Sequence, residues 1–402
     1  SWNGVTNFPA LLSFLATKDH FGALLWNLHQ EKPSSRDKPW RLLWFADECT
    51  TGCLLKRDNT RKAWCLYLSF MELGVDLLAR DSSWLIGGVI KQRNVNMVEG
   101  GFGSVAAAHL RMLFTGSHDI RRGLTLHTCH GPILLFITLG RILADTAGLK
   151  YIFDSCGPSG HKLCTHCRNV VNTRGGLEIS DGGAFVDHAC HDPSRFKRHS
   201  EEPYRRIVQE VAIPALSSTQ RNRIQTRLGF QFNTHGVPFS PDLVGVLSPT
   251  QARYDFDHTV LINGTANLEI SLLMEALDAQ GILSAGDVVA ALGEWHWPAS
   301  LHRRPNVRES KDLLCIQGSD ILGVYPVLKY LVRTRVDSDR VRLQKRSFLA
   351  MCRIRDGYSL VQRGQAPQQW PIQASVWLEC FKEAYDRRPS PNHNFMFRFE
   401  EY

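Results

Sequence analysis

The hydrophobic positions in the first third of the chain gather in short runs that are separated by polar turns. Residues 1–38 carry apolar positions spaced as on one or two helices and end in a polar linker, Glu31–Lys38. Three apolar runs rich in aromatic and branched residues follow at Trp40–Asp47, 63–74 and 84–95. Runs of this length, joined by short polar connections, predict three antiparallel strands.

The rest of the chain contains one further buried run and several long helical patterns. Gly100–Thr115 predicts a helix entered through a glycine turn, and Ile133–Asp145 is a strand-like run that ends on an acid. Tyr254–Ile262 predicts another strand. Residues 264–300 and the chain from Ser319 onward are predicted to be mostly helical. The pattern therefore predicts an α/β fold, with a mixed sheet, helices and a C-terminal helical region.

Composition and charge add a class of partner to this picture. The 402 residues are 43% hydrophobic and 21% charged, as in ordinary globular proteins. The formal net charge is +8, which favours a polyanionic partner, and nucleic acid is the common one. Cationic side chains are densest between Leu331 and Ser347, either as a surface that follows phosphates or as an ordinary solvated helix.

Cysteine usage indicates a reducing, intracellular environment. The 11 cysteines are odd in number and spread through a long chain, which argues against a secreted disulfide scaffold. No signal-peptide pattern stands at the start, and the longest apolar run, Pro132–Gly140, is too short to span a bilayer, so no membrane partner is expected. The chain begins at Ser1 rather than Met, and we therefore expect a fragment that lacks an N-terminal module.

The motif KLCTHC is the strongest single signal for a metal. Cys164 and Cys167 have the CxxC spacing of a zinc knuckle, in which two thiolates bind one side of a tetrahedral ion. Redox motifs share this spacing but lie at a strand-to-helix turn, whereas Cys164 follows a loop of Gly, Ser and His. A structural zinc site is the preferred interpretation, and reduced cysteines without metal are the alternative.

Two residue pairs compete to complete this site. Cys190 and His199 give the spacing C-x2-C-x22-C-x8-H, while His188 and His191 give C-x2-C-x20-H-x2-H. We favour Cys190 with His199 because the thiolate is the stronger zinc ligand. A site with four protein ligands is closed, so this Zn²⁺ would stabilise a loop rather than catalyse a reaction.

Two aspartates stand where apolar runs end. Asp47 closes the first run of the predicted sheet, and Asp145 closes the run that precedes the CxxC motif. Two-metal phosphoryl transfer uses carboxylates from separate segments to bind divalent ions about 4 Å apart. A single acid at such a position is most often a turn or cap residue. The pair together favours a catalytic site that binds Mg²⁺ or Mn²⁺.

Three segments resemble eukaryotic DNA transposases of the CACTA, Plavaka and Zisupton-like groups. Residues 142–167, ILADTAGLKYIFDSCGPSGHKLCTHC, are similar to the region around the second catalytic aspartate of those families. The matching residues are Asp145, Ala147 to Lys150, Gly157, Gly160, Cys164 and Cys167. WRLLWFADECTTG resembles the strand of the first aspartate, with Asp47 in the acid position. Asp255 and His258 match an Asp-x-x-His stretch that those families carry beyond the zinc ligands.

The resemblance covers about residues 40–335 and implies an RNase H-like core with a DDE/D triad, an embedded zinc knuckle and a helical insertion. It implies metal-dependent hydrolysis and strand transfer of DNA phosphodiesters by a nuclear protein that binds DNA and forms homo-oligomers. Asp320, which opens a helix with Pro326, is the expected third acid. Glu269 is its rival, and either residue could instead be structural.

The expected segments follow from these assignments. They are an N-terminal helical segment (1–38), the first part of the core (39–155), the zinc knuckle (156–200), a linker with a strand and a helical insertion (201–318), and the last core helix with a C-terminal helical region (319–402). Asp154 lies close to Asp145 and competes for the second acid position. A catalytically inactive, zinc-stabilised DNA-binding or assembly protein derived from a transposase is the alternative function, and an unrelated metal-dependent hydrolase is a third.

Overall fold

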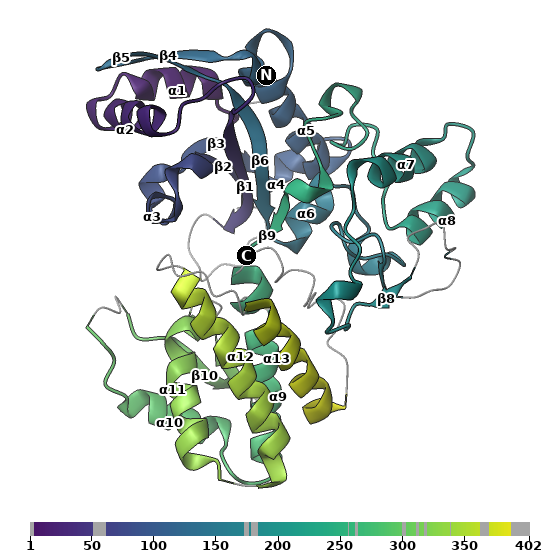
Figure 1. Cartoon of the computed structure of the whole chain (residues 1–402). Coiled ribbons are helices and arrows are strands. Elements are labelled where there is room, and N and C mark those ends of the chain that lie inside the picture. The colour runs from purple at the N-terminus through teal and green to yellow at the C-terminus, as the bar shows by residue number, and fades with distance from the viewer. Residues whose placement is uncertain are drawn as a thin grey trace. The chain divides into compact units, whose positions relative to one another are not determined.

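In the computed structural model the chain forms two compact units. Unit 1 contains Ser1–Phe185 and Lys197–Arg253, and unit 2 contains Val186–Phe196 and Tyr254–Tyr402. The structure describes residues 4–50, 62–172, 177, 184–255, 257–261, 264–299, 303–310, 313–316, 320–337, 339–361 and 370–386. Helices and strands alternate through it, so the predicted mixed α/β class is confirmed (Figure 1).

A five-stranded mixed sheet forms the centre of unit 1. Its strands are β1 (Trp40–Thr50), β2 (Lys62–Phe70), β3 (Leu85–Lys91), β6 (Ile137–Ala144) and β9 (Ala252–Tyr254). They are ordered β3-β2-β1-β6-β9, with β1, β2 and β3 antiparallel and β6 parallel to β1. The three predicted antiparallel strands are therefore confirmed, and the parallel partner comes from much later in the chain.

A bulge at Gly140 sets the register between the two parallel strands. Leu42 pairs with Leu139, but Leu43 pairs with Arg141, so Gly140 is the extra residue on β6. A Cβ at this position would lie 2.7 Å from Arg41 Cβ and 3.2 Å from the Leu42 carbonyl oxygen. Only a residue without a side chain fits there unchanged, which explains a glycine within a strand.

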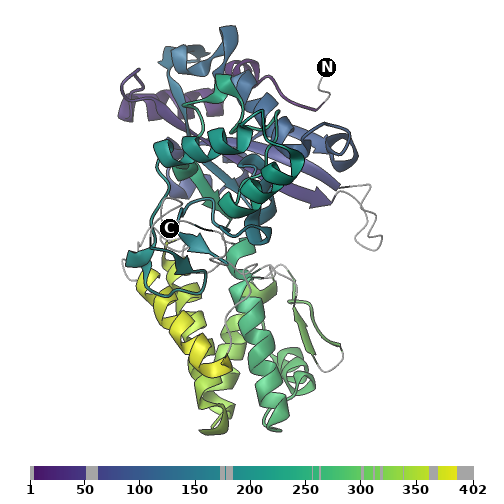
Figure 2. The ribbon, with the colours of Figure 1, turned by 90° about the vertical axis from the view of Figure 1, so that its right-hand side faces the viewer.

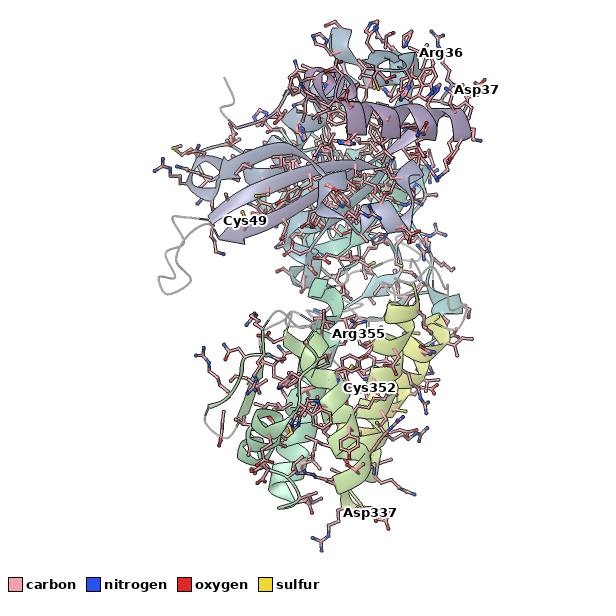
Figure 3. All side chains as sticks on the ribbon, turned by 90° about the vertical axis from the view of Figure 1, so that its left-hand side faces the viewer. Arg36, Asp37, Cys49, Asp337, Cys352 and Arg355 are labelled. Carbon is pink, nitrogen blue, oxygen red and sulfur yellow. The ribbon has the colours of Figure 1, made fainter. Side chains whose placement is uncertain are left out.

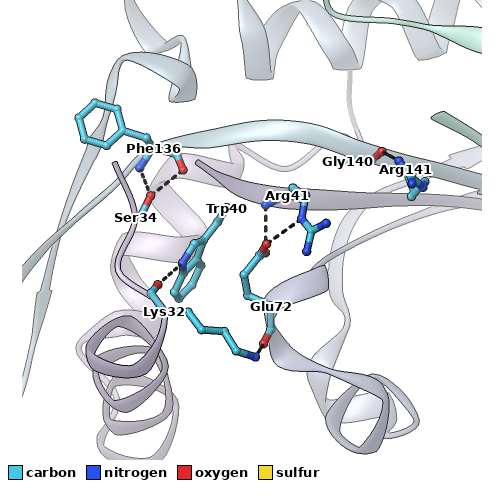
Figure 4. A network of polar contacts seen from close by, with 8 residues as sticks. All are labelled: Lys32, Ser34, Trp40, Arg41, Glu72, Phe136, Gly140 and Arg141. Carbon is cyan, nitrogen blue, oxygen red and sulfur yellow. Dashed lines mark hydrogen bonds and ion pairs between the residues drawn. The ribbon is translucent and has the colours of Figure 1, made fainter. Parts of the chain in front are cut away.

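Polar contacts hold the beginnings of β1 and β6 together (Figure 4). The buried Glu72 carboxylate accepts hydrogen bonds from the Arg41 backbone N–H (2.9 Å) and Nε (3.0 Å). Trp40 Nε1 donates to the Lys32 carbonyl oxygen, and the Ser34 hydroxyl bonds both the carbonyl oxygen and the N–H of Phe136. These bonds restrain both strands at the end opposite the aspartates.

The helices of unit 1 follow the apolar patterns of the sequence. They are α1 (Phe8–Ala16), α2 (Asp19–Glu31), α3 (Val75–Leu78), α4 (Gln92–Val95), α5 (Gly101–Phe114), α6 (Thr146–Ile152), α7 (Glu201–Ala212) and α8 (Ser218–Leu228). Helix α5 covers one sheet face: Trp44 Nε1 donates to His109 Nδ1 (2.8 Å), and Trp64 stacks on Phe102 with centroids 3.8 Å apart. Burial lowers the pKa of His109 to about 4.

Strand β1 continues three residues past the predicted end at Asp47, to Thr50, and β3 ends at Lys91, directly before α4. Two other predicted strands differ more. The run Ile133–Asp145 is divided at Phe136: residues 131–135 form β5, which pairs with β4 (Leu124–Thr128), and β6 begins at Ile137. Helices α1 and α2 pack against this hairpin (Figure 1). The run Tyr254–Ile262 is a strand only at its first residue, and Asp257–Leu261 forms a π-helical turn. In both cases an apolar run was longer than the element it contains.

Unit 2 is mainly helical. Its elements are β8 (Val186–Asp187), α9 (Thr265–Ala279), α10 (Ala285–Glu294), β10 (Val307–Ser310), β11 (Leu313–Ile316), α11 (Asp320–Arg335), α12 (Arg342–Val361) and α13 (Trp370–Tyr385). Figure 2 shows α12 beside α13, and α12 also packs on α9. Within the described residues one stretch, Thr259–Ala279, is long and apolar enough to cross a membrane, but 69% of it is buried in protein, as in a core helix.

Candidate functional site

The two aspartates that were predicted at strand ends lie side by side on neighbouring strands, although β1 continues past Asp47 to Thr50. Ala46 of β1 pairs with Ala144 of β6, and the next residue on each parallel strand is Asp47 or Asp145. Adjacent strands run about 5 Å apart, so the Cα atoms of the two aspartates are expected at about that separation. Both residues are partly exposed. The fold therefore brings together two acids that are 98 positions apart in the sequence.

Asp145 also has a structural role, because it is the N-cap of α6. Its Oδ1 accepts a hydrogen bond from the Gly148 N–H at 2.6 Å, which satisfies one of the free donors at the start of that helix. A carboxylate has about four acceptor positions, so this bond leaves others for a ligand. The structure thus shows Asp145 as a helix cap that has further acceptor positions.

Asp47 lies on the sheet face opposite α5, together with two cysteines and a tyrosine. Asp47 pairs with Cys65 across β1 and β2, and Cys49 is the next residue of β1 on that face. Burial is the main cause that raises the pKa of Cys49 to about 11, and the hydrogen bond with Cys65 and the negative charge of Asp47 add to it. Burial and a hydrogen bond with Cys65 raise the pKa of Tyr67 to about 12. At neutral pH Cys49 and Tyr67 are therefore uncharged.

Asp154, the rival second acid, lies just after α6 rather than directly after a strand. Only 7% of it is exposed, its φ is +47°, and it lines a cavity of about 630 Å³ with Trp64 and Phe102, on the sheet face opposite Asp47. Its Oδ1 accepts a hydrogen bond from Asn233 Nδ2 at 3.0 Å. Burial raises the pKa of Asp154 to about 8, so the carboxyl is mostly neutral at pH 7.

Asp320, the predicted third acid, is the first residue of α11 and is 6% exposed. Its Oδ1 forms an ion pair with Arg303 at 3.0 Å. Its Oδ2 has no hydrogen-bond partner among the residues that the structure describes. The positive end of the helix dipole and Arg303 both stabilise this carboxylate as an anion, and its second oxygen remains a hydrogen-bond acceptor. Asp320 belongs to unit 2, whereas Asp47 and Asp145 belong to unit 1.

Glu269, the rival third acid, is completely buried in unit 2. Its carboxylate accepts hydrogen bonds from Ser347 Oγ (2.9 Å), Trp377 Nε1 (2.9 Å) and Tyr385 OH (3.0 Å). Burial raises the pKa of Glu269 to about 7, and the three donors oppose this shift. A carboxylate with no exposed surface and three protein donors links α9, α12 and α13. Its geometry is that of a packing residue.

The CxxC motif has the local geometry of a knuckle. Cys164 and Cys167 are both buried, and the Cys167 N–H donates to Cys164 Sγ at 3.2 Å. An N–H bond to the first sulfur orients a thiolate and stabilises its charge. Within the described ranges, however, there is no group of three or more His, Cys, Asp or Glu side chains close enough to hold a metal ion.

Of the favoured second pair, His199 lies beside the knuckle. The His199 N–H donates to the His166 carbonyl oxygen at 2.6 Å, and Arg198 forms a β-bridge with Cys167. Burial, reinforced by the cation of Lys162, lowers the pKa of His199 to about 3, so the imidazole is neutral, as a metal ligand must be. Its Nδ1 has no hydrogen-bond partner among the described residues. These features fit a zinc ligand.

The other candidate ligands belong to unit 2, in the segment Val186–Phe196. Cys190 Sγ donates to the Asp192 carbonyl oxygen at 3.6 Å. His191 Nε2 pairs with Glu379 (3.0 Å), and its Nδ1 bonds Lys382 Nζ (3.3 Å) on α13. Both ring nitrogens of His191 thus have protein partners, which argues against His188 and His191 as the second pair of zinc ligands. His188 in turn lies next to Asp187. Cys164 and Cys167 therefore fit the knuckle half of a zinc site, but the described residues do not provide a complete set of ligands.

The remaining predicted positions give less information. Asp255 accepts backbone and hydroxyl hydrogen bonds from Thr259 through its carbonyl oxygen. The side chain of His258 lies outside the described residues. The pair Cys49 and Cys65 was missed by the sequence analysis, although both residues occupy the same alternating positions of their strands as Asp47 and Tyr67. The alternation shows which residues of one strand share a face, but only the pairing register of β1 and β2 shows that Cys49 and Cys65 are neighbours.

Comparisons with known proteins add no assignment to this geometry. No protein-family model matches the chain, and no curated protein matches it either. The functional interpretation therefore depends on the residues and distances described above.

Proposed function

We propose that this protein is a transposase, or a transposase-derived protein, that hydrolyses and transfers DNA phosphodiester bonds at a divalent-metal site. One observation carries the proposal. Ala46 and Ala144 are paired on adjacent parallel strands, and the residues that follow them, Asp47 and Asp145, therefore lie side by side. An acid after a buried run is common, but two acids side by side on adjacent parallel strands are the arrangement that a shared ion requires.

Asp47 and Asp145 are the proposed metal ligands, with Asp320 as the third acid. When bound, Mg²⁺ or Mn²⁺ would activate the attacking oxygen and stabilise the leaving oxygen. The Asp47 and Asp145 carboxylates carry negative charge, and the backbones of β1 and β6 fix their positions. Asp145 is oriented further by its bond to the Gly148 N–H. The net charge of +8 is consistent with a DNA partner.

The strand arrangement supports the RNase H-like part of the proposal. Three antiparallel strands are followed by helix α5 and by a strand, β6, that pairs in parallel with the first. Asp145 directly follows this parallel strand, whereas Asp47 lies on the first strand three residues before its end at Thr50. A zinc knuckle at Cys164 and Cys167, a nuclear location and homo-oligomerisation belong to the same proposal.

A catalytically inactive DNA-binding relative is the second candidate, and two contacts favour it. The Asp145 carboxylate caps α6, and the Asp320 carboxylate is paired with Arg303. Each contact gives the acid a structural role, so the residue would be retained even in a relative that no longer cleaves DNA.

A nuclease assay with Mn²⁺ on double-stranded DNA separates the two candidates. We expect Asp47→Asn and Asp145→Asn each to reduce cleavage at least 100-fold, because each removes a charge from the proposed ion site. Glu48→Gln is the matched control: it removes a charge from the next residue, on the opposite face, and should leave cleavage unchanged.

Three results are informative. Cleavage that survives both Asp47→Asn and Asp145→Asn would contradict the catalytic proposal. No cleavage by the wild-type chain, together with DNA binding that weakens steeply with salt, would favour the inactive relative. Loss of activity in Glu48→Gln as well would show that the assay reports a general charge effect.

A further inference from the structure

Two cysteines lie side by side next to Asp47, on the β1–β2 ladder of unit 1. Asp47 pairs with Cys65, and Cys49 pairs with Ala63, so Cys49 and Cys65 are diagonal neighbours on one face of the sheet. Cys49 is partly exposed and Cys65 is buried. Figure 3 shows Cys49 near the end of β1.

Their sulfur atoms are 3.0 Å apart. A disulfide bond is about 2.05 Å long, so closing it requires a movement of roughly 1 Å. The side chains already point toward each other, because the sulfur atoms would otherwise be separated by the full distance between the strands. All ten cysteines in the described part of the chain are free thiols, so this pair stands in its reduced form.

We propose that Cys49 and Cys65 form a redox modification site, in which a hydroperoxide converts the two thiols into a reversible disulfide between β1 and β2. The proposal does not rest on the proposed function. Cys49 is the residue that the oxidant reaches, and Cys65, with 6% of its surface exposed, is the resolving thiol.

The reaction balances in two steps. Cys49 loses its proton and its sulfur attacks one peroxide oxygen; the O–O bond breaks, the departing oxygen takes up the proton and leaves as an alcohol or water, and Cys49 becomes a sulfenic acid. Because burial raises the pKa of Cys49 to about 11, the reacting thiolate is scarce at neutral pH, and the step should become faster as the pH rises. Cys65 sulfur then attacks Cys49 sulfur, the S–S bond forms, and the hydroxyl leaves as water with the second thiol proton. Two thiols are oxidised by two electrons, and one hydroperoxide is reduced. A dithiol reductant reverses the bond.

The crosslink would restrain the strand end that carries Asp47. It closes a loop of about 15 residues between the two strands, which lowers the entropy of the unfolded chain. The oxidised protein should therefore unfold at a temperature several degrees higher than the reduced protein. This effect concerns stability and thiol chemistry, so it can be measured whether or not the chain cleaves DNA.

The test uses the full chain, reduced, freed of reductant and treated with hydrogen peroxide. Remaining thiols are alkylated, and unreduced peptides are analysed by mass spectrometry. We expect the peptides of Cys49 and Cys65 to be joined, two thiols to be lost, and dithiothreitol to restore both. Cys49→Ser should abolish the joined peptide and the rise in melting temperature, while Cys129→Ser, an exposed cysteine elsewhere, should change neither.

Other outcomes would overturn the proposal. One is that Cys49 and Cys65 both remain alkylatable after a treatment that oxidises exposed Cys129. Another is that Cys49 stops at a sulfenic or sulfinic acid that never joins Cys65. Circular dichroism of Cys49→Ser, and of Cys49→Ala as a second variant, establishes that a missing crosslink is not caused by misfolding.

Discussion

Ala46 of β1 stands directly beside Ala144 of β6, and the residue that follows each alanine is an aspartate. This alignment depends on Gly140. Before the bulge, residues of the two strands pair with an offset of 97 (Leu42 with Leu139), and after it with an offset of 98 (Leu43 with Arg141). Without the extra residue, Glu48 rather than Asp47 would stand level with Asp145.

We expect Gly140→Ala to destabilise unit 1 and to disturb this alignment. The new Cβ would meet Arg41 Cβ at 2.7 Å and Met71 Sδ at 3.0 Å. Overpacking of this kind costs about 1–3 kcal/mol, which urea unfolding can measure. Gly293→Ala is the control, since no atom lies within 4 Å of its Cβ position. Equal stability of Gly140→Ala and wild type would show that the bulge is not constrained.

The cap and the proposed chemistry of Asp145 can be separated by two substitutions. Asp145→Ala removes the acceptor for the Gly148 N–H and should lower the free energy of unfolding by about 1 kcal/mol. Asp145→Asn keeps a cap and should change it by only a few tenths of a kcal/mol. The exposed Asp37→Ala serves as control in the same urea titrations. If Asn destabilises as much as Ala, the charge and not the cap stabilises α6.

Glu269 should make stability depend on pH. Its pKa is raised by burial from 4.5 to about 7, so the folded state binds the proton more tightly than the unfolded state. The resulting stabilisation is complete below about pH 4.5 and is lost as pH rises through 7, a change of about 3 kcal/mol. Glu269→Gln removes this titration, so its unfolding free energy should fall less between pH 5 and pH 8.

The control for this prediction is Glu275→Gln, an exposed residue of the same helix, which should keep the wild-type pH dependence. Urea unfolding at several pH values measures all three proteins. If the unfolding free energies of wild type and Glu269→Gln change with pH in the same way, Glu269 titrates normally and is not buried in the folded protein.

The zinc proposal predicts about one Zn²⁺ per purified chain. Cys164→Ser and Cys167→Ser should each lower the zinc content to background, because a structural site needs both thiolates of the knuckle. Elemental analysis measures the content, and Cys129→Ser, in the turn between β4 and β5, should leave it unchanged. Zinc that persists in both knuckle variants would refute the site.

The same measurement distinguishes the second ligand pairs. His199→Ala should weaken zinc binding, since His199 lies beside the knuckle and its imidazole is neutral. His191→Ala should not, because its ring nitrogens contact Glu379 and Lys382. The opposite pattern would favour the pair His188 and His191.

The sequence by itself determined the elements and their order. The apolar runs at Trp40–Asp47, 63–74 and 84–95 became antiparallel strands, and Asp47 and Asp145 were recognisable because each follows such a run. The spacing of Cys164 and Cys167 likewise predicted a tight knuckle, and in the structure the Cys167 N–H bonds Cys164 Sγ. These features depend on residues close in the chain, and local periodicity and turn chemistry encode them.

Tertiary structure alone decided which distant residues meet. The Gly140 bulge aligns Asp47 with Asp145, the β1–β2 register brings Cys49 to Cys65, and helix packing buries Glu269. A shift of one residue in strand pairing reverses every side chain between faces, and no local pattern specifies that shift. Burial likewise depends on what packs against a helix. Chain-distant pairing and packing therefore decide which candidate acids and thiols can act together.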